Sequence, residues 1–204
     1  MSLWEHIQQT DKENCRKIGK EFELQNWTFL SIEERKKLVL KLMSFLSERL
    51  EIKKAPEISY KQLAPNNPGN YDYVRKEINI NHDSLNFGIL TAVTVAHELR
   101  HHYQYEKTED VSKVNWLNKL RNLFFKNPVE SRISYWLANP KLEPVEEWDS
   151  NFANYIRGET KTPNPNETLE DIVIGDELEE YKNQPIEEDA FRYEGIFMKQ
   201  FFID

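Results

Sequence analysis

The chain has 204 residues, 30% charged and 12% aromatic side chains, and a net charge of −8, which is the composition of a globular domain of ordinary size. This acidic balance argues against nucleic acid or an anionic membrane surface as the main partner. The single cysteine, Cys15, excludes a disulfide framework and a cysteine-rich zinc site.

The N-terminal residues show no signal peptide, and no apolar run reaches the length of a transmembrane helix. We therefore expect a cytoplasmic protein with no membrane partner, unless a segment outside this sequence directs export. We also expect one domain over residues 1–204. Its N-terminal helical part covers residues 1–52, and residues 53–204 carry a sheet, a motif-bearing helix and the C-terminal helices.

Two helices are predicted before the first strand. The first covers residues 3–22 and is charged and weakly periodic, which places Cys15 on an exposed surface. The second begins at a capping box, with Ser31 as the N-cap residue and Glu34 three positions later. It runs to about residue 50, and its apolar stripe follows helical spacing through Leu38, Leu42, Phe45 and Leu46.

Residues 55–81 change from helical to strand patterning. Prolines and a cluster of asparagine, proline and glycine break this part of the chain into short segments. Strands are predicted at 57–60, 71–74 and 77–81, and the last two alternate apolar and polar residues. We therefore expect the last two strands to form an antiparallel pair that turns at Arg75 and Lys76.

An HExxH motif lies at the end of a mostly apolar run, on a helix predicted over residues 90–104. His97 and His101 are four positions apart, so they lie on one helix face and can bind the same metal ion. Glu98 lies about 100° round the helix from His97, within reach of a metal-bound water as general base. Zinc suits this pattern because it accepts imidazole nitrogens, keeps an open position and lowers the pKa of its water. The sequence therefore predicts one Zn²⁺ per chain.

Two histidines leave a catalytic zinc site one protein ligand short. The extended histidine motif is absent, because Lys107 and Gln104 stand where that motif has a histidine and a glycine. His102 is adjacent to His101 and points to another face of the helix. A carboxylate is therefore the better candidate for the third ligand. A surface helix with two unrelated histidines is the simpler alternative, but the apolar residues before the motif disfavour it.

The rest of the chain is predicted to be mainly helical. Helices are expected at 110–126, 129–138, 145–157 and from near Pro185 to about residue 201. Residues 158–183 are polar and are expected to form a long loop.

Residues 97–104 (HELRHHYQ) and 184–190 (QPIEEDA) resemble a group of bacterial and phage-associated zincin-like metallopeptidases. That group has a G-x-Y hairpin ending in I-x-I-N, then H-E-x-R-H-x-Y-Q, a W…N-Y-I helix and Q-P-x-E-x-D-A. Matching pieces follow in the same order at 69–71, 78–81, Trp148 and 154–156. The resemblance covers roughly residues 69–200. More distantly, the E-x-x-A pattern at 187–190 is similar to that of glutamate zincins related to regulatory peptidases of the ImmA and IrrE type.

This resemblance implies an α+β, zincin-like fold that is mostly helical, with a small antiparallel sheet or hairpin beside the HExxH helix. It also implies Glu187 as the third zinc ligand, with Ala190 one turn later allowing close approach of the two helices. Glu188 and Glu130 remain alternatives for that ligand. Glu188 can instead pair with Arg192, and Glu130 lacks the pattern that surrounds the third ligand in thermolysin-like enzymes.

Three further roles follow from the resemblance. Asp189 is expected to hold a ligand histidine by its other ring nitrogen. Tyr155 is a candidate donor to the oxyanion, and packing is the competing role for this aromatic residue. Residues 77–81 are expected to be the edge strand along which an extended substrate lies.

The function expected from these residues is zinc-dependent hydrolysis of a peptide or protein substrate, with His97, His101 and Glu187 as ligands. Glu98 takes a proton from the attacking water and passes it to the leaving amine. One alternative is a binding or regulatory module of the same fold with little hydrolytic activity. Another is an amide hydrolase that acts on a non-peptide substrate. Glu98 argues against the binding module, because metal binding alone needs no carboxylate there.

Overall fold

The computed structural model describes residues 3–124, 148, 150–152 and 183–203. These residues form a mixed structure of helices and a small sheet, which confirms the predicted α+β class. In chain order the elements are α1 (Leu3–Phe22), α2 (Leu24–Trp27), α3 (Ile32–Arg49), β1 (Glu57–Lys61), β2 (Gly69–Asp72), β3 (Glu77–Asn81), the 3₁₀ helix η1 (His82–Asn86), α4 (Gly88–Phe124) and α8 (Pro185–Phe201).

The capping box at the start of α3 is confirmed. The Ser31 hydroxyl accepts a hydrogen bond from the Glu34 backbone N–H, and the Glu34 carboxylate accepts one from the Ser31 N–H. Two donors at the helix start are thereby satisfied by neighbouring side chains. The buried face of α3 is centred on Val39, Leu42, Met43 and Leu46, whereas the predicted Leu38 and Phe45 are half-buried at its border.

The prediction that Cys15 is exposed is wrong. Its side chain is 1% exposed, and the Arg49 guanidinium of α3 donates to its sulfur at 3.3 Å. The helix α1 also packs against α8, where Arg16 Nε donates to the backbone oxygen of Gln200 at 3.1 Å. Both contacts join residues far apart in the chain, so the weak periodicity of residues 3–22 did not reveal the buried face.

The sheet has the strand order β1-β3-β2. The predicted antiparallel pair is confirmed, with Tyr71 opposite Ile78 and a turn at residues 73–76. The strand β1 pairs in parallel with β3, so that Glu57 lies opposite Glu77. Because β3 is paired on both sides, it is the central strand, and the prediction of residues 77–81 as a substrate-binding edge is wrong. Local patterning did not show the partnership with β1.

The motif helix α4 is much longer than predicted. It is continuous from Gly88 to Phe124, where two helices were expected at 90–104 and 110–126. No proline and no second glycine interrupts this stretch, so nothing in its backbone chemistry ends the helix. Its N-terminal half packs on the sheet and on α3, through the fully buried side chains of Ala92, Val95, Ala96 and Leu99.

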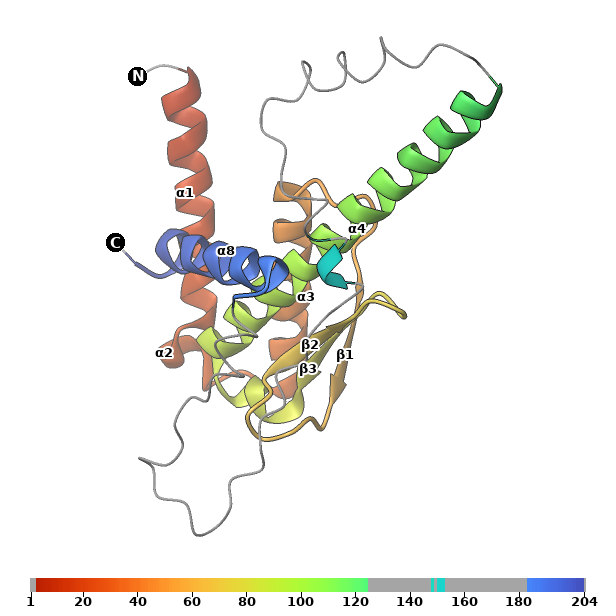
Figure 1. The fold of residues 1–204 in the computed structure, drawn as a ribbon. Helices are drawn as coiled ribbons and strands as arrows, with labels where there is room; N and C mark the ends of the chain where they lie inside the picture. Colours follow the sequence, from red (N-terminus) through yellow and green to blue (C-terminus); the bar gives the residue numbers. More distant parts are fainter. Residues whose placement is uncertain (1–2, 125–147, 149, 153–182, 204) are drawn as a thin grey trace.

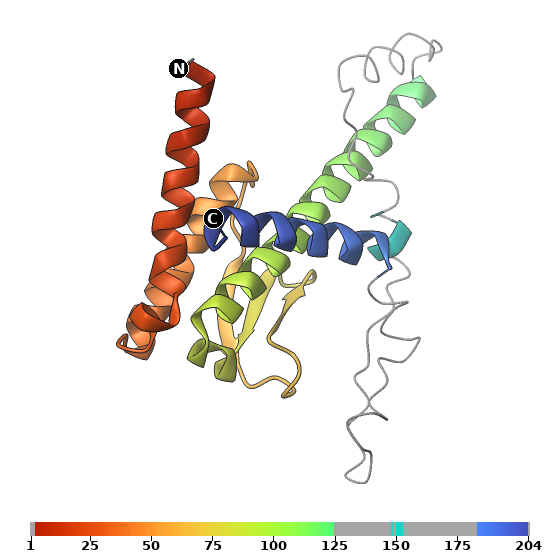
Figure 2. The same ribbon diagram turned by 90° about the vertical axis from the view of Figure 1, so that its left-hand side faces the viewer.

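The last helix, α8, crosses α4 close to the middle of the molecule, as both ribbon views show (Figures 1 and 2). It begins at Pro185, as predicted, and Pro suits the first helical turn because its missing N–H has no partner there. One hydrophobic core includes side chains from α1, α3, β3, α4 and α8, so both expected parts of the chain contribute to it. The crossing of α4 and α8 brings residues 97–104 next to residues 186–194.

Some predictions lie partly or wholly outside the described residues. The helix at 129–138 is outside them, and so is the loop at 158–183 except for its last residue. Of the helix at 145–157, the described residues 148 and 150–152 are helical, and Trp148 is fully buried. Among the residues described, no helix is both long enough and apolar enough to span a bilayer.

Gly69 allows α4 to approach the edge strand β2 closely. A Cβ atom at this position would lie 2.5 Å from Cγ2 of Thr94 on α4 and 2.8 Å from the backbone oxygen of Asn79. We therefore expect Gly69→Ala to lower the free energy of unfolding by about 1–3 kcal/mol, as overpacking does. Urea denaturation measures this. Gly195→Ala is the matched control: its Cβ meets nothing within 4 Å, so it should stabilise α8 by about 0.5–1 kcal/mol.

Candidate metal centre

The two motif histidines face each other on α4. The Nε2 atoms of His97 and His101 are 3.1 Å apart, and both residues are more than 90% buried. This arrangement follows from their spacing of four residues on a regular helix. Two imidazole nitrogens therefore converge on one point.

The first turn of α8 brings Glu187 to that point. Its two carboxylate oxygens lie 3.3 Å from Nε2 of His97 and 3.4 Å from Nε2 of His101. Glu187 is fully buried, and so is Ala190, whose small side chain lies one turn later on the same helix. The three predicted ligands thus come together, and their donor atoms lie within 4.8 Å of one another.

The spacing of these atoms fits a metal ion. Tetrahedral zinc with bonds of about 2.0–2.1 Å separates its ligand atoms by about 3.3–3.4 Å. The two imidazole nitrogens are 3.1 Å apart, and each lies 3.3 or 3.4 Å from a different oxygen of Glu187, which is close to that value for each pair of atoms. Two imidazoles and one carboxylate are also a donor set that catalytic zinc uses. His97, His101 and Glu187 therefore lie close enough together to bind one metal ion.

The carboxylates around His97 and His101 favour the protonated, positively charged form of both imidazoles. Burial acts to lower the pKa of His97, but the carboxylates of Glu187 and Glu194, with Glu98 nearby, raise that pKa to about 10. Burial likewise opposes the charged form of His101, yet its pKa is raised, mainly by the charge of Glu187. A buried site with this excess of negative charge is stabilised by a proton or by a bound cation.

Glu98 lies next to the cluster on α4 and is 8% exposed. Burial raises its pKa, and the charges of His97 and His101 act in the opposite direction. The backbone of Tyr71, on β2, also acts to lower this pKa. A carboxylate with a raised pKa is a better proton acceptor near neutral pH, which suits a general base.

His101 is held through Gln104 rather than directly by Asp189. Its Nδ1 lies 3.0 Å from the amide oxygen of Gln104. The Gln104 amide nitrogen donates to the Ile186 backbone oxygen at 2.9 Å and to the Asp189 carboxylate at 2.8 Å. Because those two groups only accept hydrogen bonds, the amide oxygen must face His101, and Nδ1 carries the proton. Asp189 therefore orients His101 through one intervening side chain.

Arg100 completes this chain of contacts. Its guanidinium makes two hydrogen bonds with Asp189, at 2.6 and 3.1 Å, and lies 4.5 Å from the centre of the Tyr103 ring. Burial alone would raise the pKa of Asp189, but the Arg100, Gln104 and Arg192 contacts lower it. The buried ion pair thus ties the motif segment of α4 to the first turns of α8.

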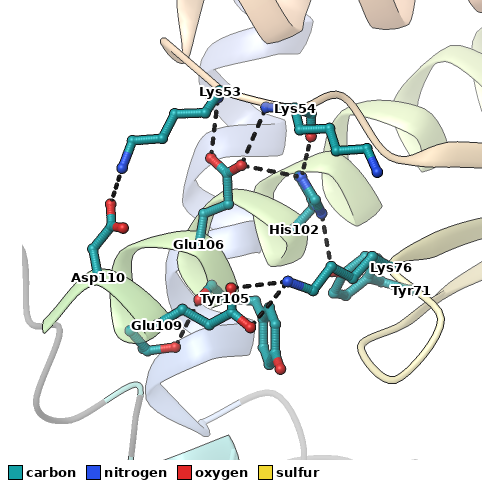
Figure 3. A network of polar contacts seen from close by, with 10 residues as sticks. Lys53, Lys54, Tyr71, Lys76, His102, Tyr105, Glu106, Glu109 and Asp110 are labelled. Atoms are coloured by element: carbon teal, nitrogen blue, oxygen red, sulfur yellow. Dashed lines mark hydrogen bonds and ion pairs between the residues drawn. The ribbon is translucent and has the colours of Figure 1, made fainter. Parts of the chain in front are cut away.

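His102 is not part of the cluster. The Tyr71 hydroxyl donates to its Nδ1 and its Nε2 donates to the Lys54 backbone oxygen, both at 2.9 Å (Figure 3). Burial lowers its pKa, which favours the neutral ring that this pattern requires. Beside it, Lys76 bridges to Glu109 at 2.8 Å. This network attaches the sheet and the segment before β1 to α4.

The remaining candidate residues from the sequence are Glu188, Glu130 and Tyr155. Glu188 is exposed, and the predicted pairing of Arg192 is made instead with Asp189, three residues earlier. Glu130 and Tyr155 lie outside the described residues.

Three contacts of the cluster were not anticipated from the sequence, namely those of Gln104, Glu194 and Phe191. Gln104 is three residues after His101, and Glu194 is seven residues after Glu187, so each shares a helix face with a ligand. Helical spacing from the ligands was therefore the signal that pointed to them.

No family model, curated protein or solved structure matches the chain.

Proposed function

We propose that this protein is a zinc-dependent peptidase of the zincin class. The observation that supports the proposal most is the buried convergence of His97, His101 and Glu187 with Glu98 beside them. A structural metal site has no need of a fourth, basic side chain next to its ligands. Two imidazoles, one carboxylate and an adjacent glutamate are what hydrolysis with a metal-activated water requires.

The two histidines and Glu187 would hold the ion. When bound there, zinc supplies a Lewis acid that polarises the scissile carbonyl and acidifies a water molecule. Glu98 accepts the proton of the attacking water and then delivers it to the leaving amine. The chain Arg100–Asp189–Gln104 keeps the Nε2 atom of His101 directed at the ion.

The experiment that tests the proposal combines metal analysis with an unbiased cleavage assay. Purified protein is supplied with zinc at neutral pH, its metal content is measured, and a proteome-derived peptide mixture is searched for new termini. The proposal predicts about one zinc ion per chain and cleavage that a chelator abolishes. Absence of bound zinc would overturn the peptidase assignment. Bound zinc without cleavage would favour the binding module of the same fold.

Glu98→Gln separates catalysis from metal binding. We expect it to keep zinc binding and to lower the cleavage rate by about 100- to 10,000-fold, the usual contribution of a general base. Glu188→Gln is the matched control, since Glu188 is exposed on α8, and its activity should equal that of the wild type. Equal cleavage by the two variants would show that Glu98 is not the base.

A further inference from the structure

We infer that Glu194 is a positioning residue for the metal ligand His97: it accepts the Nδ1 proton and so directs Nε2 at the ion. The inference rests on the metal centre proposed above. It assigns a role to a carboxylate that is not itself one of the three ligands.

One face of α8 surrounds His97. Glu187, Phe191 and Glu194 follow each other at intervals of four and three residues, so their side chains lie in a row along the helix. The row meets three parts of the same imidazole. Glu187 lies 3.3 Å from Nε2, the Phe191 ring lies edge-on at 4.8 Å between centroids, and Glu194 lies 3.3 Å from Nδ1.

The contact with Glu194 selects one tautomer of the ligand. A neutral imidazole has one N–H donor and one nitrogen with a free lone pair. A carboxylate at Nδ1 only accepts, so the proton stays on Nδ1 and the lone pair of Nε2 points at the cluster. Outer carboxylates that hold ligand histidines in this way raise their basicity and fix their orientation. Glu194 faces the ring nitrogen directed away from the cluster, and so it is not a ligand.

The two ligand histidines are held by chemically different groups. His101 is held by the neutral amide of Gln104 in a buried network, whereas His97 is held by a charged carboxylate whose side chain is 30% exposed. A change at Glu194 should therefore act on His97 alone and leave the buried network intact. This difference makes the role of Glu194 separable by mutation.

The test measures zinc affinity of the full chain by competition with a chromophoric chelator at fixed pH. We expect Glu194→Ala to weaken zinc binding by about 10- to 100-fold. Glu194→Gln keeps an acceptor for Nδ1 and should recover part of the loss. Glu188→Ala, on the exposed face of the same helix, should bind zinc as the wild type does. At saturating cobalt(II), the visible absorption bands should shift in Glu194→Ala and stay near their wild-type positions in Glu194→Gln.

The possible results separate this inference from the proposed function. If the wild type binds zinc and Glu194→Ala binds it as tightly as Glu188→Ala, the role of Glu194 is refuted while the metal centre stands. If Glu194→Ala and Glu194→Gln lose the same affinity with the same cobalt spectrum, Glu194 acts through packing, and the inference also fails. If the wild type binds no zinc, the inference and the proposed function fall together.

Discussion

Replacement of Glu187 by alanine is expected to weaken zinc binding by more than about 100-fold. Removal of a hydrogen-bond partner of a ligand histidine typically costs up to about that much, and removal of a ligand itself should cost more. The reason is the number of protein ligands. The cluster contains two histidines and one glutamate within 4.8 Å, and catalytic zinc commonly needs all three protein ligands. Isothermal titration of the metal-free protein with zinc, or competition with a chelator, measures the loss.

Glu188→Ala is the control for this measurement, because it removes the neighbouring carboxylate on an exposed face of α8. It should leave zinc affinity unchanged. If Glu187→Ala retained wild-type affinity, the assignment of the third ligand would be wrong. The search would then move to Glu130, since Glu188 faces solvent.

The contacts of this cluster that the sequence predicted are those between residues close together in the chain. The pairing of His97 with His101 follows from helix geometry within one turn, and the capping box of Ser31 with Glu34 is equally local. Both were predicted from spacing. Glu187 approaches the histidines only because α8 crosses α4, so helix periodicity alone offered several carboxylates. The resemblance to zincins was needed to choose among them.

The wrong predictions about the sheet and about Cys15 concern contacts between distant parts of the chain. The resemblance to zincins implied an edge at residues 77–81, whereas β3 pairs in parallel with β1, a segment separated from it by β2 and the loops on both sides of β2. Cys15 was placed at the surface because its contacts with Arg49 and the packing of α1 on α8 are long-range. The break expected between residues 104 and 110 is absent from α4, whose sequence has no proline or second glycine to end the helix.

The contacts of Glu194 and Gln104 with the histidines were not predicted, and the reason is different. Each shares a helix face with a ligand, but many polar residues do so without touching it. Glu194 touches a ring nitrogen only because α8 crosses α4. Gln104 contacts His101 within α4, but its amide is held in place by Ile186 and Asp189 of α8. Outer contacts of a metal site are therefore harder to predict than the ligands themselves.

Asp189→Ala is expected to lower the free energy of unfolding by about 3–5 kcal/mol, since it takes one partner of a buried ion pair away from a guanidinium that stays buried. Arg100 is 9% and Asp189 6% exposed, and two hydrogen bonds join them. The same carboxylate accepts from Gln104, so its loss also frees the group that orients His101. Urea denaturation of the metal-free protein measures the effect.

Arg192→Ala is the matched control, because Arg192 donates to the same carboxylate from a side chain that is 72% exposed. An exposed pair of this kind contributes less than about 1 kcal/mol. Equal losses in Asp189→Ala and Arg192→Ala would show that the buried contact with Arg100 does not hold the two helices together. The double variant Arg100→Met with Asp189→Leu should be more stable than Asp189→Ala, because it removes both charges of this pair.

The pH dependence of this difference follows from the lowered pKa of Asp189. Its ordinary value is 3.8, and in the folded chain the contacts with Arg100 and Gln104 outweigh burial and hold it lower. The stabilisation is therefore fully present above about pH 4 and is lost as the pH falls through the folded-state pKa. The gap in stability between wild type and Asp189→Ala should then close in acid.

Because this ion pair also fixes Gln104 against the first turn of α8, Asp189→Ala should weaken zinc binding as well as stability, whereas Arg192→Ala should change neither by much.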